Sequence, residues 1–156
     1  MRIKRAVKGM VVFMLFACSF GYLGYSFLNT SPLFDCESGV YSFYLYSQSS
    51  NAQIVTVNAV EAGERAKGLQ NIKGEGVFFD YQSNNRVYCL NIINNEIKRK
   101  KAQLVFCESG DWGKSYYYYT ERISNFCIIN GERVNLHVVI AENSASIGSP
   151  LIFGSF

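Results

Sequence analysis

The sequence contains little of what metal chemistry requires. There is one histidine, His137, among 156 residues, and none of the five cysteines belongs to a C-x-x-C pair. Structural zinc sites need closely spaced cysteine and histidine ligands. We therefore expect no metal site and no bound cofactor.

Clustered acidic residues and phosphate-binding glycines are also lacking. The twelve Asp and Glu residues are scattered, without the carboxylate pair of a glycoside hydrolase. Gly74 and Gly76 flank only Glu75, a segment too short for a phosphate loop. These absences argue against two common kinds of enzyme.

Acidic residues are absent before residue 29, where four basic residues lie in segment 1–8. From residue 29 onward, eleven basic residues therefore face all twelve acidic ones, a net charge of −1. A nearly neutral domain exerts little attraction on polyanions. We expect no binding of nucleic acid.

The longest apolar run covers residues 9–28 and contains no charged side chain. About twenty apolar residues are enough to cross a membrane as a helix. The basic flank at residues 1–8 favours a cytoplasmic N-terminus. The sequence therefore predicts a single-pass transmembrane signal anchor at 9–28 in the cell membrane, with everything after it extracytoplasmic.

Two alternatives involve cleavage of this segment. A cleaved signal peptide has a shorter apolar core followed by small residues. A lipoprotein signal would place small residues before a cysteine, and Leu15-Phe16-Ala17-Cys18 comes close. Phe16 is too large for that pattern, and the apolar run continues past Cys18. The uncleaved anchor fits best.

Residues 29–38 predict an irregular linker, and residues 39–156 predict one extracytoplasmic α+β domain. Period-two patterns and turn residues favour eight strands, at 40–47, 53–57, 77–81, 103–108, 115–120, 126–129, 132–141 and 145–153. Asn58 is expected to cap one helix, which ends at Gly68. A second helix from Ser83 or Asn84 carries an apolar stripe formed by Val87, Leu90, Ile93 and Ile97.

We expect a mixed or mostly antiparallel sheet with two helices on one face, since this arrangement buries both helical stripes. Asn130-Gly131 is typical of a tight hairpin turn. Pro150 indicates an edge strand or a bend, because proline cannot donate to a strand ladder.

Four cysteines lie beyond the apolar segment, namely Cys36, Cys89, Cys107 and Cys127. Disulfides are permitted outside a membrane, and sequence alone leaves their pairing open. Cys107 and Cys127 lie in apolar strand runs, where a free cysteine behaves as a small hydrophobic residue. Buried free thiols are the favoured interpretation.

The candidate binding residues are aromatic. Trp112 lies in a predicted turn before four tyrosines, of which Tyr117 and Tyr119 share one strand face. Such side chains can stack on sugars or form a protein-binding hot spot. The alternative is ordinary packing of the rings with wetted hydroxyls. His137 could join this surface or pair with a cysteine as nucleophile and base, although nothing in the sequence indicates an activated thiol.

Several short motifs resemble a family of short uncharacterised proteins from clostridia and related Gram-positive bacteria. The matching segments are 49–55, 73–77, 102–106, 116–119, 133–140 and the terminal GSPLIFGSF at 148–156. The family combines an N-terminal hydrophobic segment with a compact C-terminal domain. The resemblance implies no catalytic residues, and an anaerobic source would make disulfides less favoured.

Three functions follow from these patterns. The first is a non-enzymatic, membrane-anchored domain that contacts another envelope protein. The second is a binding module for a small ligand or wall glycan, which needs a concave aromatic site. The third and least favoured is an enzyme that uses a cysteine together with His137.

Overall fold

Residues 31–45 and 53–152 are described by the computed structural model of the chain, and its folded unit begins at Pro32. The predicted membrane segment at 9–28 lies outside the described residues. Among the helices that the structure describes, none combines the length and the apolar character needed to cross a membrane.

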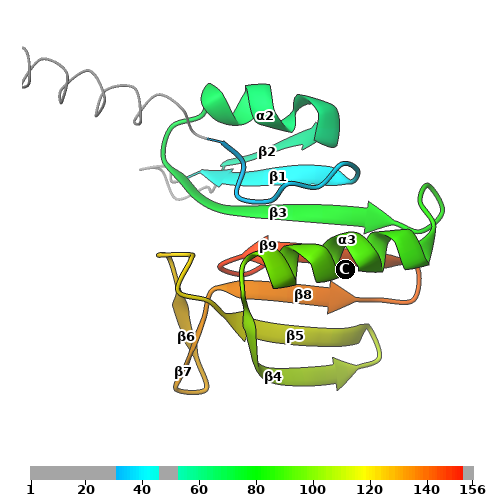
Figure 1. The fold of residues 1–156 in the computed structure, drawn as a ribbon, viewed down its shortest axis with the longest axis vertical. Coiled ribbons are helices and arrows are strands. Elements are labelled where there is room, and N and C mark those ends of the chain that lie inside the picture. Colours follow the sequence, from blue (N-terminus) through cyan, green and yellow to red (C-terminus); the bar gives the residue numbers. More distant parts are fainter. Residues whose placement is uncertain (1–30, 46–52, 153–156) are drawn as a thin grey trace, which may run out of the picture. The chain divides into compact units, whose positions relative to one another are not determined.

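The predicted α+β domain is confirmed. A seven-stranded sheet has the order β2-β1-β3-β9-β8-β5-β4, and β6 pairs with β7 separately (Figure 1). Each pairing within the described residues is antiparallel. The strands are β1 (Val40–Leu45), β2 (Gln53–Asn58), β3 (Ile72–Asp80), β4 (Gln103–Gly110), β5 (Gly113–Tyr119), β6 (Cys127–Ile129), β7 (Glu132–Val134), β8 (Leu136–Ile140) and β9 (Ser144–Ser149).

Two helices, α2 (Ala59–Lys67) and α3 (Arg86–Arg99), pack into a single core with the sheet. We call the sheet side that they cover the helix face and the opposite side the reverse face. Each large apolar side chain fully buried in this core stabilises the fold by about 1.5–3 kcal/mol. The buried core residues are Phe34, Cys36, Tyr41, Phe43, Ala62, Ala66, Val77, Phe79, Cys89, Ile93, Ile123, Leu136, Val138, Ala145 and Ile147.

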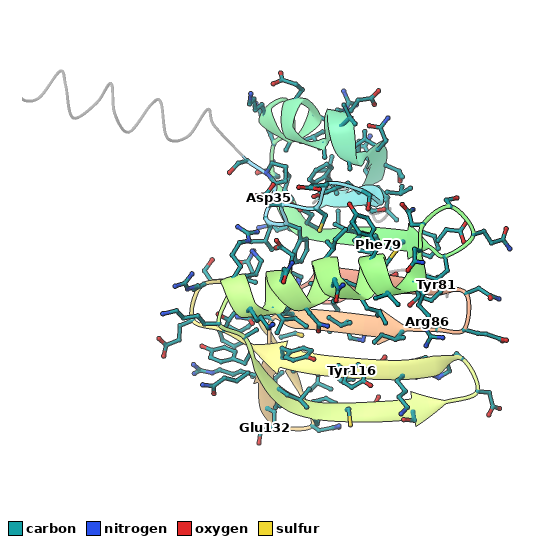
Figure 2. The ribbon with its side chains drawn as sticks, turned by 45° about the vertical axis from the view of Figure 1, so that its right-hand side comes forward. Asp35, Phe79, Tyr81, Arg86, Tyr116 and Glu132 are labelled. Atoms are coloured by element: carbon teal, nitrogen blue, oxygen red, sulfur yellow. The ribbon has the colours of Figure 1, made fainter. Side chains whose placement is uncertain are left out.

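The helix caps follow the sequence closely. The side chain of Asn58 accepts a hydrogen bond from the Glu61 N–H, and Gly68 is the C-cap of α2, as predicted. Helix α3 begins slightly later than predicted, because the Asn85 side chain caps it. Figure 2 shows Arg86 beside Tyr81 at this end, with its guanidinium carbon 5.5 Å from the ring centroid.

The apolar stripe predicted for α3 is only partly correct. Ile93 is buried, whereas Val87 is 66% exposed. The buried side of the helix is formed by Cys89, Ile93 and Glu96. Glu96 tolerates this position because its carboxylate pairs with both the Nε and Nη2 groups of Arg99. Leu90 and Ile97 also pack against the core, so three residues of the predicted stripe face the sheet and Val87 does not.

Asn135 divides the strand that was predicted at 132–141. Its side chain is fully buried, donates to the carbonyls of Thr120 and Ile123, and accepts from the Thr120 N–H. The strand assignment is interrupted at this residue, which separates β7 from β8, although its backbone N–H still donates to the Tyr118 carbonyl at 3.0 Å. The predicted turn at Asn130-Gly131 is confirmed, with both residues at positive φ.

Strand β3 begins at Ile72, earlier than predicted, and it includes Gly74 and Gly76. A Cβ at Gly74 would lie 2.7 Å from the Ser149 carbonyl oxygen, so the close approach of β9 requires glycine there. Strand β9 itself lies between β3 and β8, so it is not an edge strand. Pro150 follows directly after its end, at a bend.

Candidate functional site

Three of the predicted binding residues, Trp112, Tyr117 and Tyr119, belong to the β4–β5 hairpin, and the fourth, His137, lies on the neighbouring strand β8. Antiparallel pairing places Phe106 opposite Tyr117, and Tyr117 opposite His137. Tyr116 and Tyr118 pack against the core on the helix face, so the alternate residues Tyr117 and Tyr119 lie on the reverse face.

Trp112 turns back over the same face. A Cβ at Gly110 would lie 2.5 Å from the Trp112 Nε1 atom. Gly110 shares its strand face with Glu108, whose carboxylate accepts a hydrogen bond of 3.2 Å from the Tyr117 hydroxyl. We call this surface the hairpin face and define it by Phe106, Glu108, Trp112, Tyr117 and Tyr119.

Three rings form a stack across neighbouring strands. The centroids of Phe106 and Tyr117 lie 4.4 Å apart at an interplanar angle of 21°. Those of Tyr117 and His137 lie 4.5 Å apart at 9°. Both faces of the Tyr117 ring are therefore covered, and it cannot stack on a sugar. Phe106 ends the stack, because β4 is the last strand of the sheet.

His137 is a buried, neutral histidine with a fixed tautomer. Its Nδ1 accepts the Ile152 N–H at 3.3 Å, and its Nε2 lies 3.1 Å from the Ser115 Oγ. Since Nδ1 is an acceptor, Nε2 carries the proton and donates it to Ser115. Burial lowers the pKa of His137 to about 4. His137 therefore lies buried on the reverse face, where it holds the chain after β9 and does not add to an exposed binding surface.

The contacts around His137 do not assemble a catalytic pair. Cys107 pairs with Tyr116 and therefore lies on the helix face, opposite His137. Cys127 lies in β6, where its thiol donates to the Val134 carbonyl at 3.4 Å and burial raises its pKa. The Ser115 hydroxyl oxygen accepts a hydrogen bond from His137 Nε2, so His137 does not act as a base toward it and Ser115 is not activated as a nucleophile.

All four cysteines that the structure describes are free thiols. Cys36 and Cys89 are buried, as the sequence suggested, whereas Cys107 is exposed and Cys127 is half-buried. Cys107 differs from the prediction because β4 is an edge strand. Across residues 31–45 and 53–152, no cluster of three His, Cys, Asp or Glu side chains could hold a metal ion.

Sequence reasoning missed Glu75, which fixes the segment before β1. Its carboxylate accepts the Leu33 N–H at 2.7 Å and the Phe34 N–H at 2.9 Å, and only 3% of the residue is exposed. Burial raises its pKa to about 7, although these two hydrogen bonds oppose the shift. Lys100 Nζ donates to the Leu33 carbonyl at 2.6 Å. The segment predicted as a linker is thus partly held in the core.

Tyr119 lies beside a hollow of about 450 Å³ at the end of β5. Lys101 and Arg122 contribute positive charge there, and Glu121 contributes negative charge. Arg122 also donates from Nη1 to the Arg99 carbonyl at 2.8 Å, so part of its role is to cap α3. The hollow is lined by Lys101, Gln103, Tyr119, Thr120, Glu121 and Arg122.

No protein-family model, curated protein or solved structure matches this chain. The resemblance to short clostridial proteins therefore remains a prediction. No residue role can be transferred from another protein, and function has to be argued from the contacts described above.

Proposed function

We propose that this chain is a non-enzymatic binding domain, held at the outer side of the cell membrane by residues 9–28, which contacts another envelope protein. The uncharged length of residues 9–28 and the basic flank at 1–8 support the membrane orientation. The contacts of His137 support a structural role for this residue in place of a catalytic one.

The hairpin face is the observation that carries this proposal. Trp112 is 42% exposed, and Phe106, Tyr117 and Tyr119 on the same face are half-buried. Exposed aromatic side chains grouped on a rigid sheet are typical of protein-binding hot spots. The stack of Phe106, Tyr117 and His137 holds this surface in one conformation, so little ordering entropy is lost when a partner binds.

Site-directed photo-cross-linking in intact cells tests the proposal. The photoreactive residue p-benzoylphenylalanine would replace Trp112 in the full chain, and Phe78 in a matched control. These two aromatic residues are 42% and 43% exposed, and Phe78 lies on β3, outside the hairpin face. We expect a discrete protein adduct from position 112 and little from position 78. Equal yields at both positions, or no adduct at 112, would contradict the proposal.

A second candidate function rests on the hollow beside Tyr119, where Lys101 and Arg122 would suit a small anionic ligand or wall-glycan fragment. Calorimetric titration of the full chain in detergent with anionic wall-glycan fragments tests it. Binding that is weakened by Lys101→Ala would support this function. An absence of binding heat with the unmodified chain would exclude these fragments as ligands.

A further inference from the structure

We propose that β4 recruits its partner by strand addition. In this arrangement the partner contributes an extended segment with an aromatic side chain opposite Phe106 and a lysine or arginine opposite Glu108. This inference rests on the proposed function and specifies the class of partner. Three features of β4 support it, namely its edge, its aromatic stack and its charge.

The first feature is the exposed edge. Strand β4 is the last of seven, so the N–H and C=O groups of alternate residues point away from the sheet. Edge strands are usually protected by lysine, proline or a cover, and β4 contains neither lysine nor proline. Most of its residues are exposed. The register irregularity between Leu104 and Phe106 divides the pairing with β5, and residues 106–110 form its longer regular part.

The second feature is the aromatic stack that ends at this edge. One row of residues crosses the whole sheet on the reverse face, in the order Phe106, Tyr117, His137, Gly148, Gly76, Ser42 and Thr56. At β2 the row ends in Thr56, whereas at β4 it ends in a phenylalanine ring.

An added strand would lie about 4.8 Å beyond β4. This spacing is close to the 4.4 Å and 4.5 Å between the stacked rings. An aromatic side chain at the facing position would therefore continue the stack on the outer face of Phe106. The edge thus favours an aromatic residue at one defined position of the partner.

The third feature is the charge of Glu108. It is the one charged residue of β4, it is exposed, and it lies two residues beyond Phe106 on the same face. The Tyr117 hydroxyl fixes its carboxylate. A partner strand would place a side chain directly opposite, where a cation is favoured. A second copy of β4 offers no lysine or arginine, so the charge favours a different protein as partner.

Synthetic strand peptides test this inference. The first probe is Thr-Lys-Val-Phe-Val-Lys-Thr, which presents a cation beside the phenylalanine in either strand direction, and the second has Glu in place of both Lys residues. With the full chain in lipid nanodiscs, we expect the Lys peptide to bind about fivefold more tightly than the Glu peptide, since opposite charges across strands attract and like charges repel. The variant Glu108→Lys should reverse the preference.

The matched control is Glu132→Lys. Glu132 is also exposed and on a strand, but it belongs to the separate β6–β7 pair (Figure 2). This variant should keep the preference of the unmodified chain. Circular dichroism of both variants verifies that each is folded, so that a lost preference reflects Glu108 itself.

Different results would overturn different proposals. If the Lys and Glu peptides bind the unmodified chain equally, or if Glu108→Lys leaves the preference unchanged, strand addition at β4 is wrong. Sedimentation that shows a dimer abolished by Glu108→Lys would identify a second copy as the occupant and would also overturn it. A protein adduct at position 112 in any of these cases would leave the proposed function standing.

Discussion

The rings of Tyr117 and His137 lie nearly parallel, with centroids 4.5 Å apart and an interplanar angle of 9°. This contact joins the exposed hairpin face to the buried part of the reverse face. Because His137 also accepts the Ile152 N–H, one stack links the binding surface to the segment that follows β9.

Removal of the middle ring should therefore destabilise the domain. We expect Tyr117→Ala to lower the free energy of unfolding by about 3 kcal/mol, the lower end of the range for loss of a packed aromatic ring. Tyr119→Ala is the matched control, because Tyr119 is the same residue type on the same strand face but outside the stack. The free energy of unfolding should fall less in Tyr119→Ala than in Tyr117→Ala. Equal losses in urea unfolding of the two variants would contradict a structural role for the stack.

Stability should depend on pH through His137. Its pKa is about 4 in the folded protein against an ordinary value of 6.5. As the pH falls from 6.5 towards 4, the unfolded chain takes up a proton that the folded chain does not. The contribution of His137 therefore declines over this window, by at most about 1.4 kcal/mol per pH unit.

Glu75 gives the stability a pH dependence of the opposite sign. Its pKa is about 7 in the folded protein against 4.5 ordinarily. Between pH 4.5 and 7 the folded chain holds a proton that the unfolded chain lacks, so this contribution declines as the pH rises. Urea unfolding should show stability falling with decreasing pH in Glu75→Gln and rising with decreasing pH in His137→Gln. Parallel pH profiles of the two variants would contradict these assignments.

Hydrogen exchange should report how the segment before β1 is held. Glu75→Ala removes the acceptor of the Leu33 and Phe34 N–H groups, so their exchange should accelerate up to about tenfold, since an ordinary hydrogen bond contributes about 0.5–1.5 kcal/mol. Tyr41→Phe instead removes the acceptor of the Cys36 N–H and should accelerate exchange there. If each variant accelerates all three amides equally, the segment opens as a whole and the assignment of separate contacts is wrong.

Cysteine labelling should establish the orientation in the membrane. Cys107 is the exposed thiol among the described residues, whereas Cys36 is buried and makes a poor reporter. In a chain with Cys18→Ser and Cys127→Ser, a membrane-impermeant maleimide should label intact cells, and Cys107→Ser should abolish the signal. Labelling that requires lysis of the cells would place the domain on the cytoplasmic side.

Local sequence signals predicted much of the fold. The Asn58 cap and the Asn130-Gly131 turn depend on neighbouring residues, and both are confirmed. The α+β class and the mostly antiparallel sheet followed from hydrophobic periodicity and turn residues. The alternation along β5 correctly placed Tyr117 and Tyr119 on one face, opposite Tyr116.

The features that sequence could not predict depend on contacts between distant residues. In the sequence Glu75 stood out only as the residue between Gly74 and Gly76, yet its hydrogen-bond partner Leu33 lies 42 residues away. The same limitation applies to His137 and to Cys107, because burial at these positions depends on strand order. Once β4 is known to be the edge strand, Phe106 and Glu108 emerge as site residues that a hydrophobic pattern does not distinguish.

Photo-cross-linking from position 112 in intact cells, repeated with Glu108→Lys, tests the central claim most directly. If the hairpin face binds an envelope protein through the edge of β4 and the charge of Glu108, the adduct should form in the chain with unmodified Glu108. Its yield should fall strongly in Glu108→Lys and stay the same in Glu132→Lys. An adduct whose yield is the same in all three chains would show that the partner is not recognised at this edge. The absence of an adduct in all of them would contradict the binding function itself.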